Sequence, residues 1–378
     1  MIYTKSNTSY PPVAFHRNST VANDRKASIK FCANFSKDES APNLQFIDYL
    51  KRIIASATSI QHLSLGCLPS LTQFNNEIVE CLSQYQSSSI KSLHISRCQS
   101  SEVCVYQPIG IQDLLMLRGL QYLSLDMADL SDLLLTSLTE GGRAKLVSLN
   151  INIFTHEEGV RQIRDRTWNL VHQSCPDLIL TLNLIKCAEA VRDMMTVVNA
   201  SMPLTHLRVL FCDELYVSGL HHVARHQCST LQSLLIVESM REGPIFYDIG
   251  VDEQDPFVMM SWRCKKLSSF SVIGVALREH DVLAVARLRG MQLTKFEVLE
   301  ECITAFNNND SEFEEDYAMS FETFCEEIST SLAREWLPLT LDDDVVDDCL
   351  VYYDSPECNA YLPILMADQL SALPLNIH

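Results

Sequence analysis

Histidine and cysteine gather at one place in the chain, where they could bind a metal. His221, His222, His226 and Cys228 lie within eight residues of one another, and imidazole nitrogens and thiolates are common zinc ligands. No second cysteine or histidine pair has the spacing that would complete the coordination sphere. We therefore interpret these residues as surface histidines beside a structural cysteine. We expect neither a metal nor another cofactor.

The sequence lacks the patterns that catalysis would need. No cysteine stands in a protease signature, and there is no GxGxxG, P-loop or HExxH motif. The paired carboxylates Glu314-Glu315 and Asp342-Asp343 lie in polar runs, where nothing nearby would desolvate them for acid-base catalysis. We expect that the protein is not an enzyme.

Negative charge is concentrated near the C-terminus. Between Glu297 and Asp348 there are 17 Asp and Glu residues and one basic residue, Arg334, so this segment carries −16 of the net charge of −19. Nucleic-acid binding needs Lys and Arg on one surface to neutralise phosphates, so we expect no nucleic-acid partner. A local field of this size favours a basic protein surface instead.

The sequence shows no membrane or secretion signal. No apolar run approaches the roughly 20 residues that cross a bilayer, and the first twenty residues lack the apolar core of a signal peptide. The 14 cysteines are spread along the chain, which we interpret as reduced, buried thiols. We expect an intracellular protein, cytoplasmic or nuclear, with no membrane partner.

A short phrase, apolar-x-x-apolar-x-apolar, recurs nine times and shows which elements carry the candidate residues. The phrases begin at Ile60, Ile90, Leu120, Leu146, Ile179, Leu204, Leu231, Leu267 and Leu293, near or somewhat above the period of leucine-rich repeats. Positions four and six of each phrase alternate along a short strand and point into the core, whereas positions three and five point outward. Between the phrases lie segments with helical spacing, such as Phe74, Ile78 and Leu82.

One strand and one helix cannot bury their apolar faces alone, so the units must stack. The sequence predicts an α/β leucine-rich-repeat solenoid, a horseshoe with parallel strands on its concave side and helices on its convex side. The array covers residues 60–301. It follows a flexible N-terminus at 1–26 and an N-terminal cap at 27–59, with a strand in 27–35 and a helix through Phe46, Leu50 and Ile54.

Residues 302–378 are predicted to form an acidic loop and a C-terminal cap. Phe324, Ile328, Leu332 and Trp336 recur every four residues, with Ser320 as N-cap and Pro338 as terminator, which predicts a helix. The run from Cys349 to Tyr353 predicts a strand.

The cysteines point to a particular repeat subtype. Cys228 and Cys264 stand three residues before a phrase, Cys175 stands four before, and Cys98, Cys187 and Cys212 follow a strand. This pattern resembles the cysteine-containing repeat of F-box and leucine-rich-repeat proteins, the substrate receptors of cullin-RING ubiquitin ligases. The resemblance covers about residues 60 to 301. It implies a non-catalytic receptor that holds a protein substrate on its concave face while the rest of the ligase transfers ubiquitin.

The chain departs from that family in its first segment. Residues 1–59 contain neither the Leu-Pro pair nor the tryptophan that the F-box of the family carries. We therefore expect the F-box to be absent from this chain, so that the cullin-RING adaptor is a partner only if an upstream F-box exists. A leucine-rich-repeat scaffold or regulator with no connection to ubiquitination is the alternative.

The outward strand positions are the candidate protein-binding residues. Position seven of the phrases becomes apolar in the later half of the array, at Leu210, Val237, Ile273 and Leu299, which indicates either a binding patch or coverage by the C-terminal tail. The candidates on the concave face are His94, Tyr122, Asp126, Asn150, Asn152, Asn183, His206, Arg208, Leu235, Val237, Lys295 and Glu297.

Overall fold

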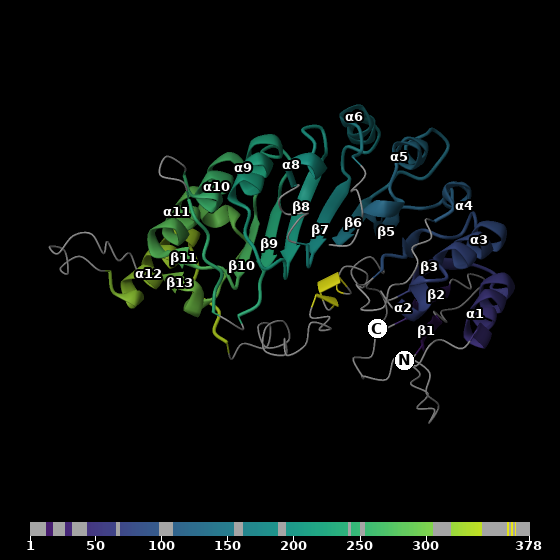
Figure 1. Ribbon diagram of the computed structural model, residues 1–378, viewed down its shortest axis with the longest axis horizontal. Helices are drawn as coiled ribbons and strands as arrows, with labels where there is room; N and C mark the ends of the chain where they lie inside the picture. Colours follow the sequence, from purple (N-terminus) through teal and green to yellow (C-terminus); the bar gives the residue numbers. More distant parts are fainter. Residues whose placement is uncertain are drawn as a thin grey trace, which may run out of the picture. The chain divides into compact units, whose positions relative to one another are not determined.

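The computed structural model describes residues 13–17, 27–31, 44–65, 69–97, 109–154, 162–187, 194–240, 243–249, 254–304, 319–341, 361–362, 364–365 and 367. Strands and helices alternate along these segments (Figure 1). They divide into two compact units. Unit 1 comprises residues 1–152, 169–179 and 361–378, and unit 2 comprises residues 153–168 and 180–360.

Unit 1 is built on parallel strands that follow chain order. The strands are β1 (Val13–Arg17), β2 (Ala27–Phe31), β3 (Ile60–Ser64), β4 (Ser92–His94), β5 (Tyr122–Asp126) and β6 (Ser148–Phe154). Strands β2 to β6 are parallel, and β1 pairs with β2 in the antiparallel sense. The helices are α1 (Leu44–Ser56), α2 (Pro69–Thr72), α3 (Asn75–Tyr85), α4 (Ile111–Met116) and α5 (Asp132–Leu138), with the 3-10 turn η1 (Met127–Asp129). Helices α1, α3, α4 and α5 pack in series on one side of the strands (Figure 1).

Unit 2 repeats this arrangement. Strands β7 (Ile179–Ile185), β8 (Leu204–Leu210), β9 (Ser233–Val237), β10 (Ser269–Ile273) and β12 (Lys295–Val298) are parallel and follow chain order. Helices α8 (Met194–Val197), α9 (Val217–His226), α10 (Pro256–Arg263), α11 (Glu279–Arg289) and α12 (Phe321–Leu332) pack in series. The boundary between the units passes through α6 (Asp165–Ser174). The smaller elements are β11 (Leu277–Arg278), β13 (Ile303–Thr304), η2 (Gly290–Gln292) and η3 (Glu300–Cys302).

The strand register follows the sequence phrases, and each of the nine phrases overlaps a strand. The position-four side chains align as Leu63, Leu93, Leu123 and Leu149 in unit 1 and as Leu182, Leu207, Leu234, Phe270 and Phe296 in unit 2. All are buried, as are the side chains at position six. The predicted α/β class with parallel strands is confirmed. The period of two along each strand places positions four and six on the same face, which the helices cover.

The predicted leading strand and helix are also present, as β2 and α1. The N-terminus differs from expectation, because β1 lies within the segment predicted to be flexible. The predicted acidic loop at 307–317 and the strand from Cys349 to Tyr353 lie outside the described residues. Among the described helices, none is long and apolar enough to cross a membrane.

A row of aromatic rings runs through the core of unit 2. Ring centroids lie 5.8 Å apart between Phe257 and Phe270, 5.6 Å between Phe270 and Phe296, and 5.4 Å between Phe296 and Trp336. The indole Nε1 of Trp336 also donates to the carbonyl oxygen of Phe296, at 2.9 Å. The last repeat is therefore closed by an aromatic side chain that lies beyond the repeats themselves.

The predicted extent of the last helix was wrong at its C-terminal end. Ser320 caps α12 as expected, accepting from the amide of Thr323, but the helix ends at Leu332, because Ala333 adopts a left-handed conformation with φ of 54°. Trp336 then turns back, and its amide donates to the hydroxyl oxygen of Ser329. Pro338 is therefore not the terminator.

Replacing Leu234 with Ala should destabilise the protein. Leu234, at position four of its phrase on β9, is fully buried. The loss of its methyl groups should therefore cost about 2–5 kcal/mol of unfolding free energy. Met291, which is 75% exposed, offers a control whose change to Ala should stay within about 0.5 kcal/mol. Urea denaturation of both variants tests this. If both variants lost the same amount of unfolding free energy, Leu234 would not be a core residue.

Candidate protein-binding surfaces

The outward side chains of unit 2 form two rows across its strands. The register aligns Thr181, His206, Ser233, Ser269 and Lys295 at position three, and Asn183, Arg208, Leu235, Ser271 and Glu297 at position five. Between β8 and β12 these side chains are half-buried or exposed, apart from Ser271. Thr181 and Asn183, on β7, are buried. Unit 2 thus presents an accessible band over β8, β9, β10 and β12.

The accessible band of unit 2 mixes charged and apolar groups. Arg208 and Leu235 are partners in the strand register. The Nζ atom of Lys295 lies 2.8 Å from Oε2 of Glu297, and the hydroxyl of Ser271 donates to that same oxygen at 2.7 Å. Leu337, which is 66% exposed, lies two residues before the isolated bridge that joins Leu339 to Leu299 beyond β12. A guanidinium, an ion pair, the half-buried Leu235 and the exposed Leu337 are groups that suit contact with another protein.

The same rows in unit 1 are mostly covered. Position three holds His62, Ser92, Tyr122 and Ser148, and position five holds Ser64, His94, Ser124 and Asn150. Tyr122 and Ser148 are half-buried, whereas the other six side chains are buried. His94 and Asn150 therefore have little surface to offer a partner in this structure.

Among the residues that the structure describes, those at position seven are buried in both units. Asp126 and Asn152 are buried in unit 1, and Leu210, Val237, Ile273 and Leu299 are buried in unit 2. The apolar members were expected either to bind a partner or to be covered. They form no open apolar patch.

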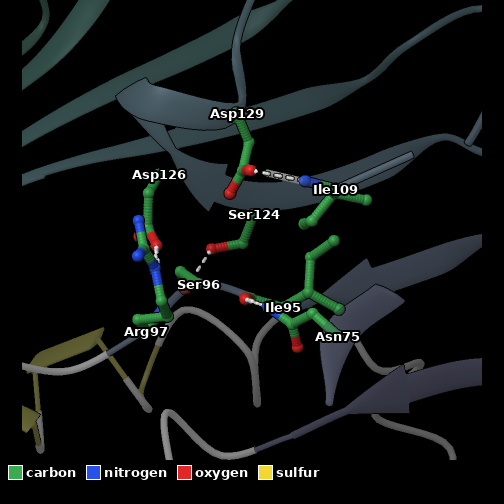
Figure 2. Close-up of polar contacts among 8 residues, drawn as sticks. All are labelled: Asn75, Ile95, Ser96, Arg97, Ile109, Ser124, Asp126 and Asp129. Carbon is green, nitrogen blue, oxygen red and sulfur yellow. Dashed lines mark hydrogen bonds and ion pairs between the residues drawn. The ribbon is translucent and has the colours of Figure 1, made fainter. Parts of the chain in front are cut away.

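Asp126 ties two neighbouring repeats of unit 1 together (Figure 2). Its carboxylate accepts from the backbone amide of Arg97 at 3.2 Å and from the guanidinium Nε of the same residue at 2.5 Å. Burial raises the pKa of Asp126 to about 7, while the charge of Arg97 opposes the shift. Two similar ties lie beside it, from the Ile109 amide to Asp129 and from the Asn75 side-chain amide to the Ile95 carbonyl.

Glu238 makes the corresponding tie in unit 2. Its two carboxylate oxygens accept from the amides of Cys212 at 3.1 Å and Asp213 at 3.0 Å, while the amide of Phe211 donates to the Val237 carbonyl. Phe211 and Asp213 have positive φ angles of 55° and 59°, and the amides of Phe211, Cys212 and Asp213 all turn toward β9. Two of the three bind the Glu238 carboxyl group. Burial raises the pKa of this carboxyl group to about 8, against the effect of the two amides.

The buried thiols beside the strands are structural. The Sγ atom of Cys212 lies 3.5 Å from the amide nitrogen of Cys187 and 3.6 Å from the carbonyl oxygen of Leu184, and both cysteines are buried. Burial raises the pKa of Cys212, and it raises those of Cys264 and Cys302 to about 12 and about 11. A thiol held in its protonated form is a poor nucleophile.

Sequence reasoning missed a second set of ties at the helix ends. The side-chain amide of Gln86 donates to the carbonyls of Ile54 and Ala57, and that of Gln227 donates to the carbonyl of Asn199. Arg289 donates to the Lys265 carbonyl in the same way. Each of the three stands four residues before a phrase begins, and that recurring position was the available signal. Asp129 and Glu238 were missed as well.

The histidine cluster lies at the helices of unit 2. The imidazoles of His222 and His226 have centroids 4.4 Å apart, and Nε2 of His222 lies 2.8 Å from the carbonyl oxygen of Val198. They line a shallow groove of about 490 Å³ together with Arg164, Asp165 and Met195. Within the described residues, no three His, Cys, Asp or Glu side chains are arranged to hold a metal.

Comparison with known proteins relates the chain to one kind of protein. It is 24% identical to F-box only protein 33 of Mus musculus over 226 residues, covering 58% of this chain and 39% of the relative. It is 23% identical to F-box only protein 33 of Homo sapiens over 228 residues, covering 58% and 40%. The chain is distantly related to an F-box protein. It spans about two fifths of the length of these curated relatives. No family model matches the chain.

Replacing Glu238 with Gln should weaken the pH dependence of stability. In the unfolded chain this carboxyl group loses its proton near its ordinary pKa of 4.5, whereas in the folded chain it holds the proton up to about pH 8. The folded state binds the extra proton between these values, so this group makes stability fall as the pH rises from about 5 to 8. Melting temperatures from pH 5 to 9 should fall less in Glu238→Gln than in the wild type.

Glu238→Gln should also melt lower than the wild type at pH 6, because one backbone amide loses its acceptor. The exposed Glu335 serves as control, and Glu335→Gln should follow the wild-type pH curve. A Glu238→Gln curve parallel to that of the wild type would contradict the assignment.

Substitutions at two glycines with positive φ distinguish the cost of backbone strain from the cost of a steric clash. Gly274 has φ of 81°, and a Cβ atom there would lie 2.3 Å from the carbonyl oxygen of Glu238, whereas Gly243 has φ of 93° and open space around that position. Ala at either position should cost about 1–2 kcal/mol of backbone strain. Gly274→Ala should lower the free energy of unfolding by about 1–3 kcal/mol more than Gly243→Ala does, because the backbone must move to relieve the clash. Similar denaturation midpoints for the two variants would refute the close approach.

Proposed function

We propose that this chain is the substrate-recognition part of an F-box type receptor for a cullin-RING ubiquitin ligase, with no catalytic role of its own. In this proposal the parallel α/β repeats form a leucine-rich-repeat solenoid whose strand face binds a protein substrate. The accessible band of unit 2 is the observation that carries the proposal, because half-buried His206, Arg208 and Leu235 side chains lie there on rigid strands. The distant similarity to F-box only protein 33 supports the ligase context.

Arg208 and Leu235 are the residues we propose as anchors. Arg is over-represented among interface hot spots, and its guanidinium offers several donors in a fixed plane. Leu235 lies beside it in the register and adds apolar area. The Lys295 and Glu297 pair lies two strands further along, where it would add specificity more than affinity.

The strand face is tested with matched variants of the full chain. A triple variant, His206→Ala, Arg208→Ala and Leu235→Ala, should weaken binding of a captured partner at least tenfold, or about 1.4 kcal/mol. Its melting temperature should change little, because none of the three side chains is fully buried. The control is Trp262→Ala on α10, which is also accessible but lies on a helix. Dissociation constants from titration with the purified partner decide between them.

The ligase role needs its own measurement. A substrate should become more abundant when cullin-RING activity is inhibited, and the triple variant expressed in place of the wild type should have the same effect. If the partner binds through the strand face but its lifetime depends on neither change, the chain is a scaffold outside ubiquitination. If the triple variant binds as tightly as the wild type, the strand face is not the binding site.

A further inference from the structure

A groove runs over the helices of unit 2, between the start of α6 and helices α8, α9 and α10. These last three helices lie side by side (Figure 1). One part of the groove, of about 490 Å³, is lined by Met195, His222 and His226, and a second part, of about 350 Å³, is lined by Met195, His222 and Arg225. Because the two parts share Met195 and His222, they form one continuous groove, which lies entirely within unit 2.

The lining of this groove is basic, although the chain has a net charge of −19. Arg164 and Arg225 line the groove together with the three histidines of α9, whereas Asp165 is the one acidic residue among the lining residues. The Asp165 carboxylate already accepts from the backbone amide of Ser201 at 2.9 Å and from the hydroxyl of the same residue at 2.7 Å. The charge of the groove therefore favours an anionic ligand.

The hydrogen bond of His222 determines which of its ring nitrogens can bind a ligand. Its Nε2 atom lies 2.8 Å from the carbonyl oxygen of Val198. Because a carbonyl oxygen can only accept, Nε2 carries a proton whether the ring is neutral or charged. The neutral ring then has a lone pair at Nδ1, which disfavours a carboxylate, whereas the charged ring has an N–H donor there. His222 thus favours an anion after it takes up a proton.

His226 lies beside His222, with the two ring centroids 4.4 Å apart. Partial burial lowers the pKa of His226, and the charges of His222 and Arg225 lower it further, while Asp165 opposes the shift. Arg164 is the other charged residue of the lining. A carboxylate beside the two rings favours their charged forms and so raises their pKa values. Binding of a carboxylate should therefore be coupled to proton uptake and should be tighter at lower pH.

Two methionines add apolar surface to the groove. Met195 is 51% exposed and lines both parts, and Met259 is half-buried and lines the part that contains Arg225. Thioether side chains adapt to apolar groups of varied shape. Recognition of a phosphate group relies on clustered arginines, whereas Arg164 and Arg225 lie on different elements. Carboxylates combined with apolar side chains, as in an acidic protein segment, suit this lining better.

We propose that the groove binds an acidic segment of a partner protein, whose carboxylates contact His222, His226 and Arg225 and whose apolar side chains contact Met195 and Met259. Binding is coupled to proton uptake by the histidines, so the partner is held more tightly at pH 6.0 than at pH 7.5. The groove lies on the helix side of the strands, away from the accessible band, and this site is independent of the strand face proposed for the substrate.

A labelled peptide of glutamates and leucines tests the chemistry of the ligand on the full chain. It should bind at least fivefold more tightly at pH 6.0 than at pH 7.5, as measured by fluorescence anisotropy. Calorimetric titration in buffers of different ionisation enthalpy should show that protons are taken up on binding. The same peptide with glutamine at each glutamate should bind at least tenfold more weakly at pH 6.0. Equal binding of the two peptides would overturn the proposal.

Glutamine substitutions test whether the histidines are responsible for the pH dependence. The variant His222→Gln, His226→Gln keeps a side-chain amide that can donate to the Val198 carbonyl, but neither glutamine can take up a proton. It should bind the glutamate peptide equally at pH 6.0 and pH 7.5. The matched control is His172→Gln, at an exposed position of α6 outside the lining, which should tighten like the wild type. If the double variant still tightens at pH 6.0, the proposal is wrong.

Arg225 gives a test that does not depend on the histidine variant folding. Arg225→Gln should weaken binding of the glutamate peptide at least threefold at both pH values, because it removes a permanent positive charge from the groove. Arg263, which is exposed on α10 but is not part of the lining, is the control, and Arg263→Gln should leave the affinity unchanged. Equal affinities of the two variants would contradict the assigned position of the ligand.

Two other occupants of the groove would also overturn the proposal. A peptide with phosphoserine at each glutamate that binds at least tenfold more tightly than the glutamate peptide at pH 7.5 would identify a site for phosphorylated segments. A dimer of the chain at pH 6.0, seen by analytical ultracentrifugation and lost in the His222→Gln, His226→Gln variant, would show that a second copy occupies the groove. We expect the glutamate peptide to bind a monomer.

Discussion

The requirement that every buried backbone group find a hydrogen-bond partner governs how the repeats of each unit join. Parallel strands connected by helices leave amides and carbonyls without partners wherever a strand or a helix ends. Side chains of the neighbouring repeat provide these partners, as Glu238 does for two amides after β8 and Gln86 does for two carbonyls at the end of α1. A buried group left without a partner costs about 1–3 kcal/mol, so these ties oppose any slip of one repeat against the next.

These ties account for the unusual carboxyl groups of the protein. Asp126 and Glu238 lie where water is excluded because a tie between repeats must be short and enclosed. Burial raises the pKa values of both groups, as it does in many active sites. Here each carboxyl group already accepts hydrogen bonds from backbone amides or from Arg97, so their role is to hold the repeats together. A raised pKa alone is therefore a poor guide to catalysis in this fold.

The fold favours recognition across a face. The strands of each unit place like positions side by side, so a row of side chains from successive repeats forms one continuous surface. In unit 2 that surface is accessible over β8, β9, β10 and β12, and in unit 1 most of its side chains are buried. Two strand faces with one register can thus differ in the exposure of their outward side chains.

The sequence by itself determined the nine strands, their inward and outward positions, and the N-cap of α12, because a period of two and an N-cap serine act within a few residues. Only the tertiary structure decided which outward side chains are accessible. Ser92 and Ser233 occupy equivalent positions in their phrases, yet one is buried and the other is half-buried. The end of α12 was misjudged for the same reason, since Trp336 leaves the helix to pack on Phe296. The burial of a side chain depends on which distant parts of the chain pack against it, and the local sequence pattern does not contain that information.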